Sequence, residues 1–427
     1  METKSSALCL FDERAIQSDI RSNFSTPFYP KTNITPGAPI EFEINGTPDE
    51  YVDLAESRLQ VKIKLVKTDA TAWDKAADKV ALINLPIASI FQDVFLTLGD
   101  MAVEGGQHMY PYNAYLSTLL NFHPSAKKVQ LEAWGWQEDT PAKFDDMDTN
   151  DGFQIREAET TGGSSWEVSG PLFLDLTRQN RYILPQTNIR LKLLPAKADF
   201  ALHAKAGNKY DFRIESCILH IHRVRVVDSV IAGHNKGLIK QNAKYPINHI
   251  EATSYTITKG SIWDNRDNLF VSQIPKFLVI GFVEHDAFNG NMQKSPFNFQ
   301  HFDLKELALY IDGEITPDRI LTPDYGNNAY TDVYNCTMNA QKYYNTDDSN
   351  GLTIEHFLDG YNLYAFDLTA DGNCQADHRN LTKTGSLRIT LKFGAALAKP
   401  INVVLYSVFD SKLEITRLRD VILSYAR

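Results

Sequence analysis

Alternation of apolar and charged side chains is the most frequent pattern in the chain. Residues 40–44 read Ile-Glu-Phe-Glu-Ile, and residues 59–65 read Leu-Gln-Val-Lys-Ile-Lys-Leu. A period of two residues places the apolar side chains on one face of a strand and the charged ones on the other, as a half-buried antiparallel strand requires. Turn residues such as Asp312-Gly313 separate these patterns. The sequence therefore predicts a protein built mainly from β-strands.

Helical patterns are scarce. Residues 110–122, YPYNAYLSTLLNF, predict one short helix, and residues 228–243, DSVIAGHNKGLIKQNA, are compatible with another. We therefore expect an all-β fold in which short helices lie in the loops.

The chain repeats itself. Asp-Leu-Thr at residues 175–177 recurs at residues 367–369, so that Asp175 pairs with Asp367, and a strand-like alternation follows each copy. Earlier matches keep the same order, and they pair Val61 with Leu278, Gly99 with Asp312, and Ala114 with Ala329. The spacing shortens before the second Asp-Leu-Thr, which indicates that the first half has the longer middle loop.

A repeat of this length is too long for a solenoid or a propeller blade. It fits two tandem eight-stranded antiparallel jelly rolls, each with short strands separated by turns. We predict an N-terminal arm at residues 1–27, a first jelly roll at 28–228 and a second at 229–427. The arm is polar and lacks strand periodicity. No linker rich in Gly, Ser or Pro occurs near Asp228, so we expect a buried apolar seam between the halves.

Charge and cysteine content narrow the possible functions. The 427-residue chain has a formal net charge of −10 and no block of Lys or Arg, which argues against a surface that coats nucleic acid. Cys9, Cys217, Cys336 and Cys374 are scattered, as is typical of a reduced compartment. No apolar run approaches the roughly 20 residues that span a bilayer.

No familiar catalytic motif occurs, whether a nucleophile elbow, a phosphate-binding loop, a dinucleotide fingerprint or a zinc-protease helix. His220 and His222 place two imidazoles on one face of a strand. Cupin-type metalloenzymes use such a pair with a nearby glutamate, but Arg223 and Arg225 follow here. A polar strand face or an interdomain contact is the favoured interpretation, and a cupin-like metalloenzyme is a weaker one.

One acidic loop contains weak calcium candidates. Asp146, Asp148, Asn150 and Glu157 fall at positions 1, 3, 5 and 12 of an EF-hand loop. The turn glycine, Gly152, sits at position 7 instead of 6, and no flanking helices are expected. A solvated acidic loop is the favoured interpretation, and no other metal or cofactor is predicted.

Several long segments carry a family resemblance. Residues 33–54 (NITPGAPIEFEINGTPDEYVDL), 286–313 (DAFNGNMQKSPFNFQHFDLKELALYIDG) and 359–369 (DGYNLYAFDLT) resemble the hexon-like double jelly-roll major capsid proteins. The resemblance is to those of Polinton (Maverick) elements and adintoviruses in particular. It runs from about Phe28 almost to the C-terminus, and it is collinear.

The resemblance implies a structural role without catalysis. Three chains would form a trimer with a pseudo-hexameric outline, and such capsomers would tile an icosahedral shell around double-stranded DNA. The implied partners are other copies of the chain, then penton and minor capsid proteins. The implied location is the virion, after synthesis in the host cytoplasm.

The resemblance also assigns loops to places. Residues 122–170 and 336–360 would lie at the exposed top of the capsomer, and the N-terminal arm would point inward or bind a neighbour. The alternative function is a tandem jelly-roll protein that binds carbohydrate or a receptor. Aromatic clusters such as residues 134–136 could be ligand-stacking platforms, although burial in a core or interface fits them better.

Overall fold

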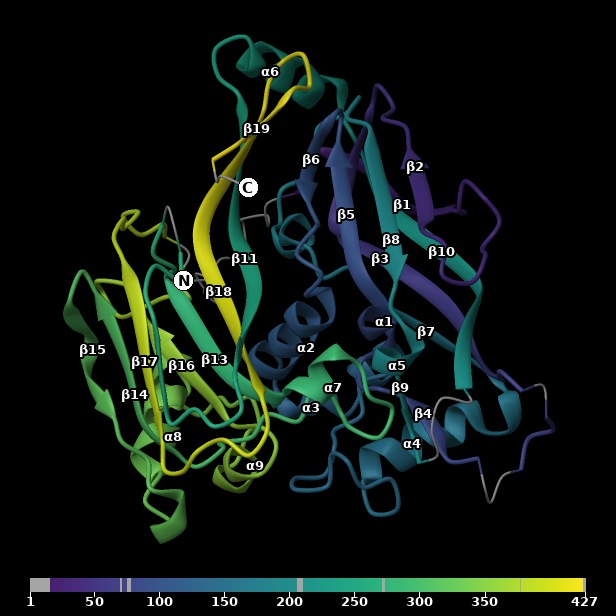
Figure 1. The fold of residues 1–427 in the computed structure, drawn as a ribbon. Helices are drawn as coiled ribbons and strands as arrows, with labels where there is room; N and C mark the ends of the chain where they lie inside the picture. The colour runs from purple at the N-terminus through teal and green to yellow at the C-terminus, as the bar shows by residue number, and fades with distance from the viewer. Residues whose placement is uncertain are drawn as a thin grey trace, which may run out of the picture.

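Strands form antiparallel sheets throughout the computed structural model, which describes residues 16–424 except 70, 75–77, 206–209, 271–272 and 377 (Figure 1). The first half contains two four-stranded sheets, ordered β1-β10-β3-β7 and β2-β8-β5-β6. Their bounds are β1 (Ile20–Phe28), β2 (Ile40–Ile44), β3 (Glu50–Lys67), β5 (Phe91–Leu98), β6 (Met101–Glu104), β7 (Ser165–Pro171), β8 (Ile189–Pro195) and β10 (Tyr210–Val226). These strands make up the first roll.

The second half repeats this arrangement in sheets ordered β11-β18-β13-β16 and β12-β17-β14-β15. Taken in chain order, each of its strands holds the same place as its counterpart in the first roll. Its strands are β11 (Ala243–Ile257), β12 (Trp263–Arg266), β13 (Phe277–Glu284), β14 (Leu304–Ile311), β15 (Glu314–Leu321), β16 (Leu363–Asp367), β17 (Leu387–Phe393) and β18 (Ile401–Ile415). They make up the second roll. The predicted fold class, two tandem eight-stranded jelly rolls, is confirmed.

Two further strand pairings are short, and the first of them forms a separate two-stranded sheet. β4 (Val80–Leu82) pairs with β9 (Leu202–Ala204), and β19 (Val421–Leu423) pairs with the end of β18. Both are antiparallel.

Helices occupy the loops between strands, as the sequence predicts. Residues 110–121 form a helix between the rolls (Figure 1), and the helix that begins at Asp228 connects β10 to β11. In the described ranges no helix has the length and apolar character to cross a membrane. The helices are α1 (Pro86–Ser89), α2 (Tyr110–Asn121), α3 (Pro124–Lys127), α4 (Asp151–Thr160), α5 (Ala198–Ala201), α6 (Asp228–Leu238), α7 (His285–Asn289), α8 (Thr331–Ala340) and α9 (Ile354–Leu358), with 3₁₀ turns η1 (Gln130–Trp134), η2 (Thr161–Gly163), η3 (Asp175–Arg178) and η4 (Tyr325–Asn327).

The burial of each strand follows from how many faces of its sheet are covered. In β3, Val61 and Ile63 are fully buried while Lys62 between them is exposed, as in a strand with one covered face. In β18, every residue from Ile401 to Ser411 is buried. That sheet is therefore covered on both faces.

The start of the first sheet differs from the sequence-based boundary. Residues 20–27 were assigned to the N-terminal arm, but they form most of β1, which pairs with β10 from Ile20 to Phe28. The sequence pattern does not reveal this strand because polar residues and proline fill most of it, and an edge strand needs few apolar residues. Residues 1–15 of the predicted arm lie outside the described residues.

The cysteines are not cross-linked where the structure describes them. Cys217, Cys336 and Cys374 are free, and burial raises the pKa of Cys217 to about 12. Cys9 lies outside the described residues.

A buried ion pair anchors the long loop of the first roll. Arg156 in α4 and Asp139 are each 2% exposed, and Arg156 Nη2 lies 2.7 Å from Asp139 Oδ1. Arg156 also donates from Nε to the Leu82 carbonyl at 2.9 Å and from Nη1 to the Gln137 carbonyl at 3.0 Å. One side chain thus ties the loop to β4.

Replacing Arg156 should therefore be costly. In the Arg156→Met variant, the buried Asp139 carboxylate loses its charged partner, and the free energy of unfolding should fall by about 3–5 kcal/mol. Arg319→Met is the control, because Arg319 pairs with Asp332 at an exposed site where solvent screens the charges, and its loss should change the free energy of unfolding little. Chemical denaturation measures both. Equal, small losses in the two variants would contradict the anchoring role.

Candidate functional site: the seam between the two jelly rolls

The open edge of β11 is closed by side chains of the first roll. β11 is an edge strand, and in Figure 1 it lies on the side of the second roll that faces α2 and β6. The Ile250 N–H donates to Asp175 Oδ1 at 3.1 Å, and the Ala252 N–H donates to Gln107 Oε1 at 3.3 Å. An edge strand otherwise leaves such groups unpaired. Asp175 and Gln107 therefore take the place of a neighbouring strand.

The other end of β11 is closed in the same manner. Arg181 Nη1 donates to the Lys244 carbonyl at 2.5 Å, and the Tyr245 hydroxyl donates to the Tyr182 carbonyl at 3.1 Å. Pro246, also in β11, has no N–H to leave unpaired. The seam thus satisfies the backbone groups of Lys244, Ile250 and Ala252 in this strand.

Acidic side chains gather where β11 meets the first roll. Asp175 Oδ2 lies 2.7 Å from His249 Nδ1, beside a cavity of about 300 Å³ lined by both rolls. Glu104, at the end of β6, accepts the backbone N–H groups of Asp175 at 3.0 Å and Leu176 at 3.3 Å. Burial, reinforced by the negative charge of Asp175, raises the pKa of Glu104 well above its ordinary value. We call this site the Glu104 pocket.

Aromatic rings fill the middle of the seam. Tyr115 of α2 stacks on Phe297 of the loop after β13, with ring centroids 4.1 Å apart and planes 4° from parallel. Tyr112 stacks on Phe288 at 5.4 Å and donates its hydroxyl to the Pro296 carbonyl at 3.0 Å. Such ring pairs contribute about 0.5–1.5 kcal/mol beyond the area they bury. The expected apolar seam is therefore present and buried.

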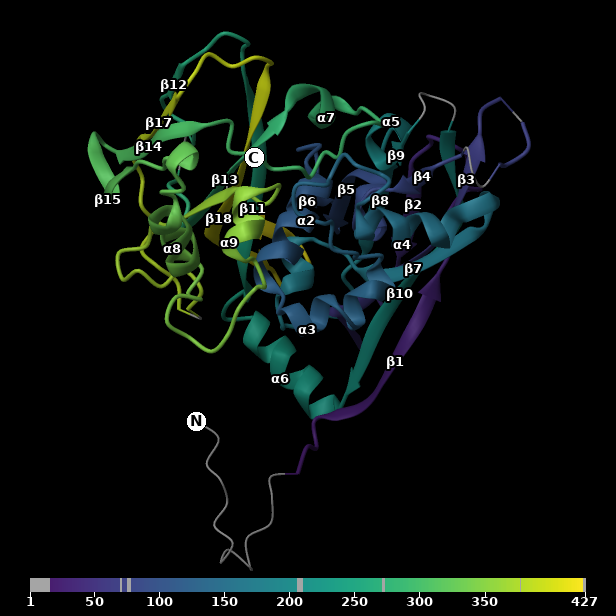
Figure 2. The same cartoon turned by 90° about the horizontal axis from the view of Figure 1, so that it is seen from below.

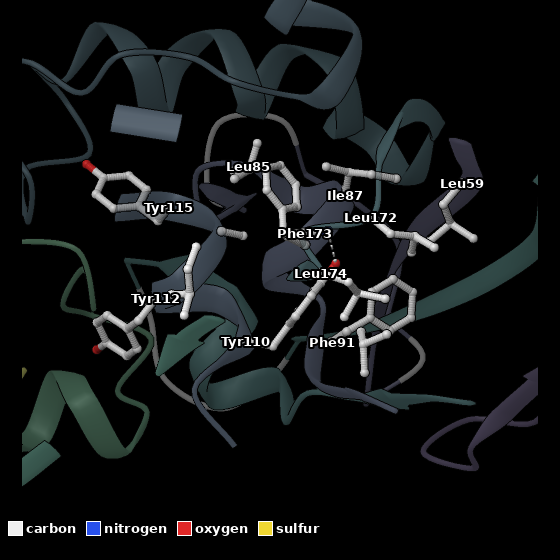
Figure 3. Packing of buried hydrophobic residues seen from close by; sticks show 14 of the residues in the cluster. Leu59, Leu85, Ile87, Phe91, Tyr110, Tyr112, Tyr115, Leu172, Phe173 and Leu174 are labelled. Carbon is white, nitrogen blue, oxygen red and sulfur yellow. Dashed lines mark hydrogen bonds between the residues drawn. The ribbon is translucent and has the colours of Figure 1, made fainter. Parts of the chain in front are cut away.

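The helix α2 serves both rolls because its tyrosines point in different directions. Figure 3 shows Tyr112 and Tyr115 on one side of the helix and Tyr110 on the opposite side. The Tyr110 hydroxyl accepts the Phe173 N–H at 3.2 Å within the first roll. One helix thereby joins the core of the first roll to the seam.

The two loops predicted to lie at the exposed top meet each other. Lys127 Nζ donates to the carbonyls of Leu119 and Asn350, each at 2.7 Å, and burial lowers the pKa of this ammonium to about 8. The Tyr361 hydroxyl donates to the Asp139 carbonyl at 2.7 Å. The long loops of both rolls are thus one packed unit.

The matched residues Gly99 and Asp312 lie in corresponding turns. Each is the first residue of the two-residue turn that joins its hairpin, β5–β6 or β14–β15. Their φ angles are 58° and 51°, in the left-handed region that glycine adopts freely and aspartate tolerates.

The other matched pairs lie near corresponding elements but do different work. Asp175 begins η3 after β7 and faces the second roll, whereas Asp367 ends β16 and accepts the N–H groups of Thr369 and Cys374. Ala114 lies inside α2, and Ala329 precedes α8. The spatial equivalence of these pairs stays a prediction.

The calcium candidates have other partners. Asp148 pairs with Lys205 at 2.7 Å and also with Lys79, and these two ammonium groups lower its pKa to about 2. The oxygens of Asp146 accept the N–H groups of Asp148 and Thr149 in a local turn.

The rest of that loop corrects the expectation that no helix flanks it. Asn150 caps α4, which begins at Asp151 and contains Glu157. The Asn150 side-chain amide also donates to Asp139 at 2.9 Å. Within the ranges that the structure describes, no three His, Cys, Asp or Glu side chains are grouped to hold a metal ion.

The histidine pair of β10 lies on a polar strand face. His220 Nε2 lies 2.8 Å from Gln60 Oε1, and burial together with the Arg58 charge lowers the pKa of His220. The His222 backbone N–H donates to the Ser57 hydroxyl at 3.1 Å. This arrangement fits the favoured interpretation better than a metalloenzyme site.

Sequence reasoning missed most of the seam. Glu104, Gln107 and His249 carry no motif, because their roles depend on backbone or side-chain groups more than 70 residues away along the chain. Phe297 had a weak signal, since it lies in the segment 286–313 that resembles capsid proteins.

We compared the sequence and the fold of the chain with those of known proteins. No family model matches the chain. An uncharacterized protein of Caenorhabditis elegans, F54H12.2, is 23% identical over 346 residues, which cover 78% of this chain and 80% of that protein.

Solved structures give a fuller match. A chain of the Sputnik virophage structure has a TM-score of 0.66 at 14% identity, over 99% of this chain and 92% of that one. The mavirus major capsid protein has a TM-score of 0.56 at 11% identity (99% and 96%), and the Faustovirus major capsid protein 0.56 at 9% identity (96% and 93%). The chain has the double jelly-roll fold of these viral proteins. At such identities the likeness concerns the fold.

The Glu104 pocket should make stability depend on pH. The pKa of Glu104 is raised in the folded protein, so folding favours its protonated form; this stabilisation is complete below the ordinary value of 4.5 and is lost as pH rises through the folded-state pKa. Glu104→Gln cannot ionise. Its unfolding free energy relative to the unsubstituted protein should therefore increase with pH, by about 1.4 kcal/mol per unit of pKa shift.

Denaturant titrations between pH 4 and pH 8 measure this difference. Glu167→Gln is the control, because Glu167 is exposed on β7 and its replacement should leave the difference flat. If the difference in unfolding free energy for Glu104→Gln is also independent of pH, the pocket does not disfavour the charged form of Glu104.

The aromatic seam predicts a second effect on stability. Phe297→Ala removes a fully buried ring that stacks on Tyr115, and the free energy of unfolding should fall by about 3–5 kcal/mol. Leu381→Ala, at a side chain that is 94% exposed, should change it by less than about 0.5 kcal/mol. Thermal and chemical denaturation report both, and a loss below 1 kcal/mol for Phe297→Ala would argue against a seam that stabilises the chain.

Proposed function

We propose that this chain is a major capsid protein that forms trimeric, pseudo-hexameric capsomers. The observation that carries the proposal is the double jelly-roll fold, which the chain shares along nearly its whole length with capsid proteins of the mavirus and Faustovirus. The seam supports it physically, because it joins two similar wedges into one unit. Three such chains supply six similar wedges, which fill a hexagonal position in a shell.

The finer assignment is to capsid proteins of the Polinton and adintovirus type. It rests on the sequence resemblance in residues 33–54, 286–313 and 359–369. The relative in a nematode agrees with this assignment, because copies of such elements are integrated in animal genomes.

The proposed partners follow from the proposed role. The chain associates first with itself through obligate interfaces of about 2,000 Å² or more, and then through weaker contacts in an icosahedral lattice around double-stranded DNA. Penton and minor capsid proteins bind this lattice. The protein is made in the host cytoplasm and resides in the virion, and the packed loops around Lys127 and Tyr361 form its outer surface.

The proposal predicts the size and shape of the purified protein. Light scattering after size-exclusion chromatography should give about three times the 48.2-kDa mass of the chain. Negative-stain micrographs should show hexagonal outlines and, under assembly conditions, closed shells. A stable monomer with a saturable glycan site would instead support the carbohydrate-binding or receptor-binding alternative.

A further inference from the structure

The second roll has a sheet that the first roll covers. Leu278 and Leu405 point into the core of the second roll, whereas Val279 and Tyr406, on the other face of the same strands, belong to the cluster shared with the first roll. All four are at most 2% exposed. The first roll also closes part of the β11 edge of this sheet, through its bonds to Lys244, Ile250 and Ala252.

The equivalent sheet of the first roll is open. In β3, Lys62 is exposed on the face that corresponds to Val279. β1, the counterpart of β11, lies along the outer side of the first roll, away from β11 and β18 (Figure 2). In the part of the chain that the structure describes, residues 22–29 make no backbone hydrogen bond to a segment other than β10. The chain thus closes one of its two equivalent edges.

The strand registers show which residues correspond at the two edges. The sequence alignment pairs Val61 of β3 with Leu278 of β13. We therefore trace the register from Gln60, one position before Val61, across β10 to β1. Gln60 lies opposite Ile218 in β10. The β1 register, carried one residue beyond the pairing of Phe28 with Leu219, places Tyr29 beside Ile218.

The same path through the second roll ends at a buried residue. The alignment partner of Val61 is Leu278, so Phe277 corresponds to Gln60. Phe277 lies opposite Val408 in β18, and Val408 lies opposite Ile250 in β11. Ile250 is 7% exposed in the seam, whereas its counterpart Tyr29 is 67% exposed. The first roll thus exposes a large aromatic side chain to solvent at the position where the second roll buries an isoleucine.

We propose that the free edge of β1, with Tyr29, binds the second roll of another copy of this chain and repeats the seam between chains. In the seam within the chain, β11 is closed by the segments that follow β6 and β7. The corresponding segments of the neighbouring copy follow β15 and β16, at residues 322–329 and 368–376. The two contacting surfaces differ, so the contact is heterologous and generates a ring when the rotation closes.

This inference rests on the proposed function and names the surface by which the capsomer assembles. In the ring, the outer edges of β1 and of β11 are each closed by the neighbouring roll. The seam within one chain is then the template for the seam between chains. Tyr29 should lose most of its exposure on assembly, and the outward N–H groups of β1 should gain partners.

The test is a charge placed at Tyr29. Tyr29→Asp would bury a carboxylate in the contact between chains, which is unfavourable. The concentration at which the assembled protein dissociates should therefore rise at least 100-fold. The variant should run as a single chain at micromolar concentration. Because Tyr29 is exposed in the single chain, the thermal unfolding profile of the monomer should keep its cooperativity. Val129→Asp is the matched control, because Val129 is 72% exposed and belongs to the loop between α3 and η1 and not to β1; this variant should stay assembled.

Hydrogen exchange distinguishes the possible failures. The amides of residues 22–29 that point away from β10 should exchange at least 10-fold more slowly in the assembled protein than in the Tyr29→Asp monomer. A Tyr29→Asp variant that stays trimeric, with fast exchange in these residues, would overturn the inference and leave the capsid proposal intact. An unsubstituted protein that is monomeric at every concentration would overturn both.

Discussion

The open edge of one strand sets the relative position of the two jelly rolls. β11 ends its sheet, and its outward backbone groups need partners that no strand of its own roll supplies. Asp175 and Gln107 of the first roll provide them. Hydrogen bonds to backbone groups are directional, so the first roll cannot slide along β11 without breaking several at once. The aromatic packing of α2 against the second roll then follows from this position.

The seam combines interactions with different physical roles. Stacking of Tyr115 on Phe297 and burial of the far face of the β11-β18-β13-β16 sheet supply apolar contact, which is strong but tolerant of small displacements. The polar contacts fix the relative orientation of the two rolls. They do so at an energetic cost, since Glu104 is held in a site that disfavours its charged form. The proposed capsid role would use both properties, because the shape of such a subunit must stay fixed while it is packed among neighbours.

Much of the fold could be predicted from the sequence, because jelly-roll strands are amphipathic and their pattern occurs twice along the chain. The alternation in residues 59–65 predicted β3, and the match of Asp312 with Gly99 placed two equivalent hairpin turns. β1 was missed, since an edge strand with one shielded side needs few apolar residues. Helix α4 was not predicted because the residues around its start resemble an acidic loop. Asn150 could be either a helix cap or a calcium ligand, and only its contacts in the structure distinguish the two roles.

The sequence by itself determined the architecture: two equivalent rolls and the order of their strands. These depend on local periodicity and turn chemistry, which neighbouring residues encode. Only the tertiary structure decided what each copy of a repeated residue does. Asp175 closes the edge of the other roll, while its sequence counterpart Asp367 bonds within its own roll, to the loop that follows it and to Lys342. The difference arises because a carboxylate takes its role from the donors that folding brings to it, and those donors lie far away along the chain.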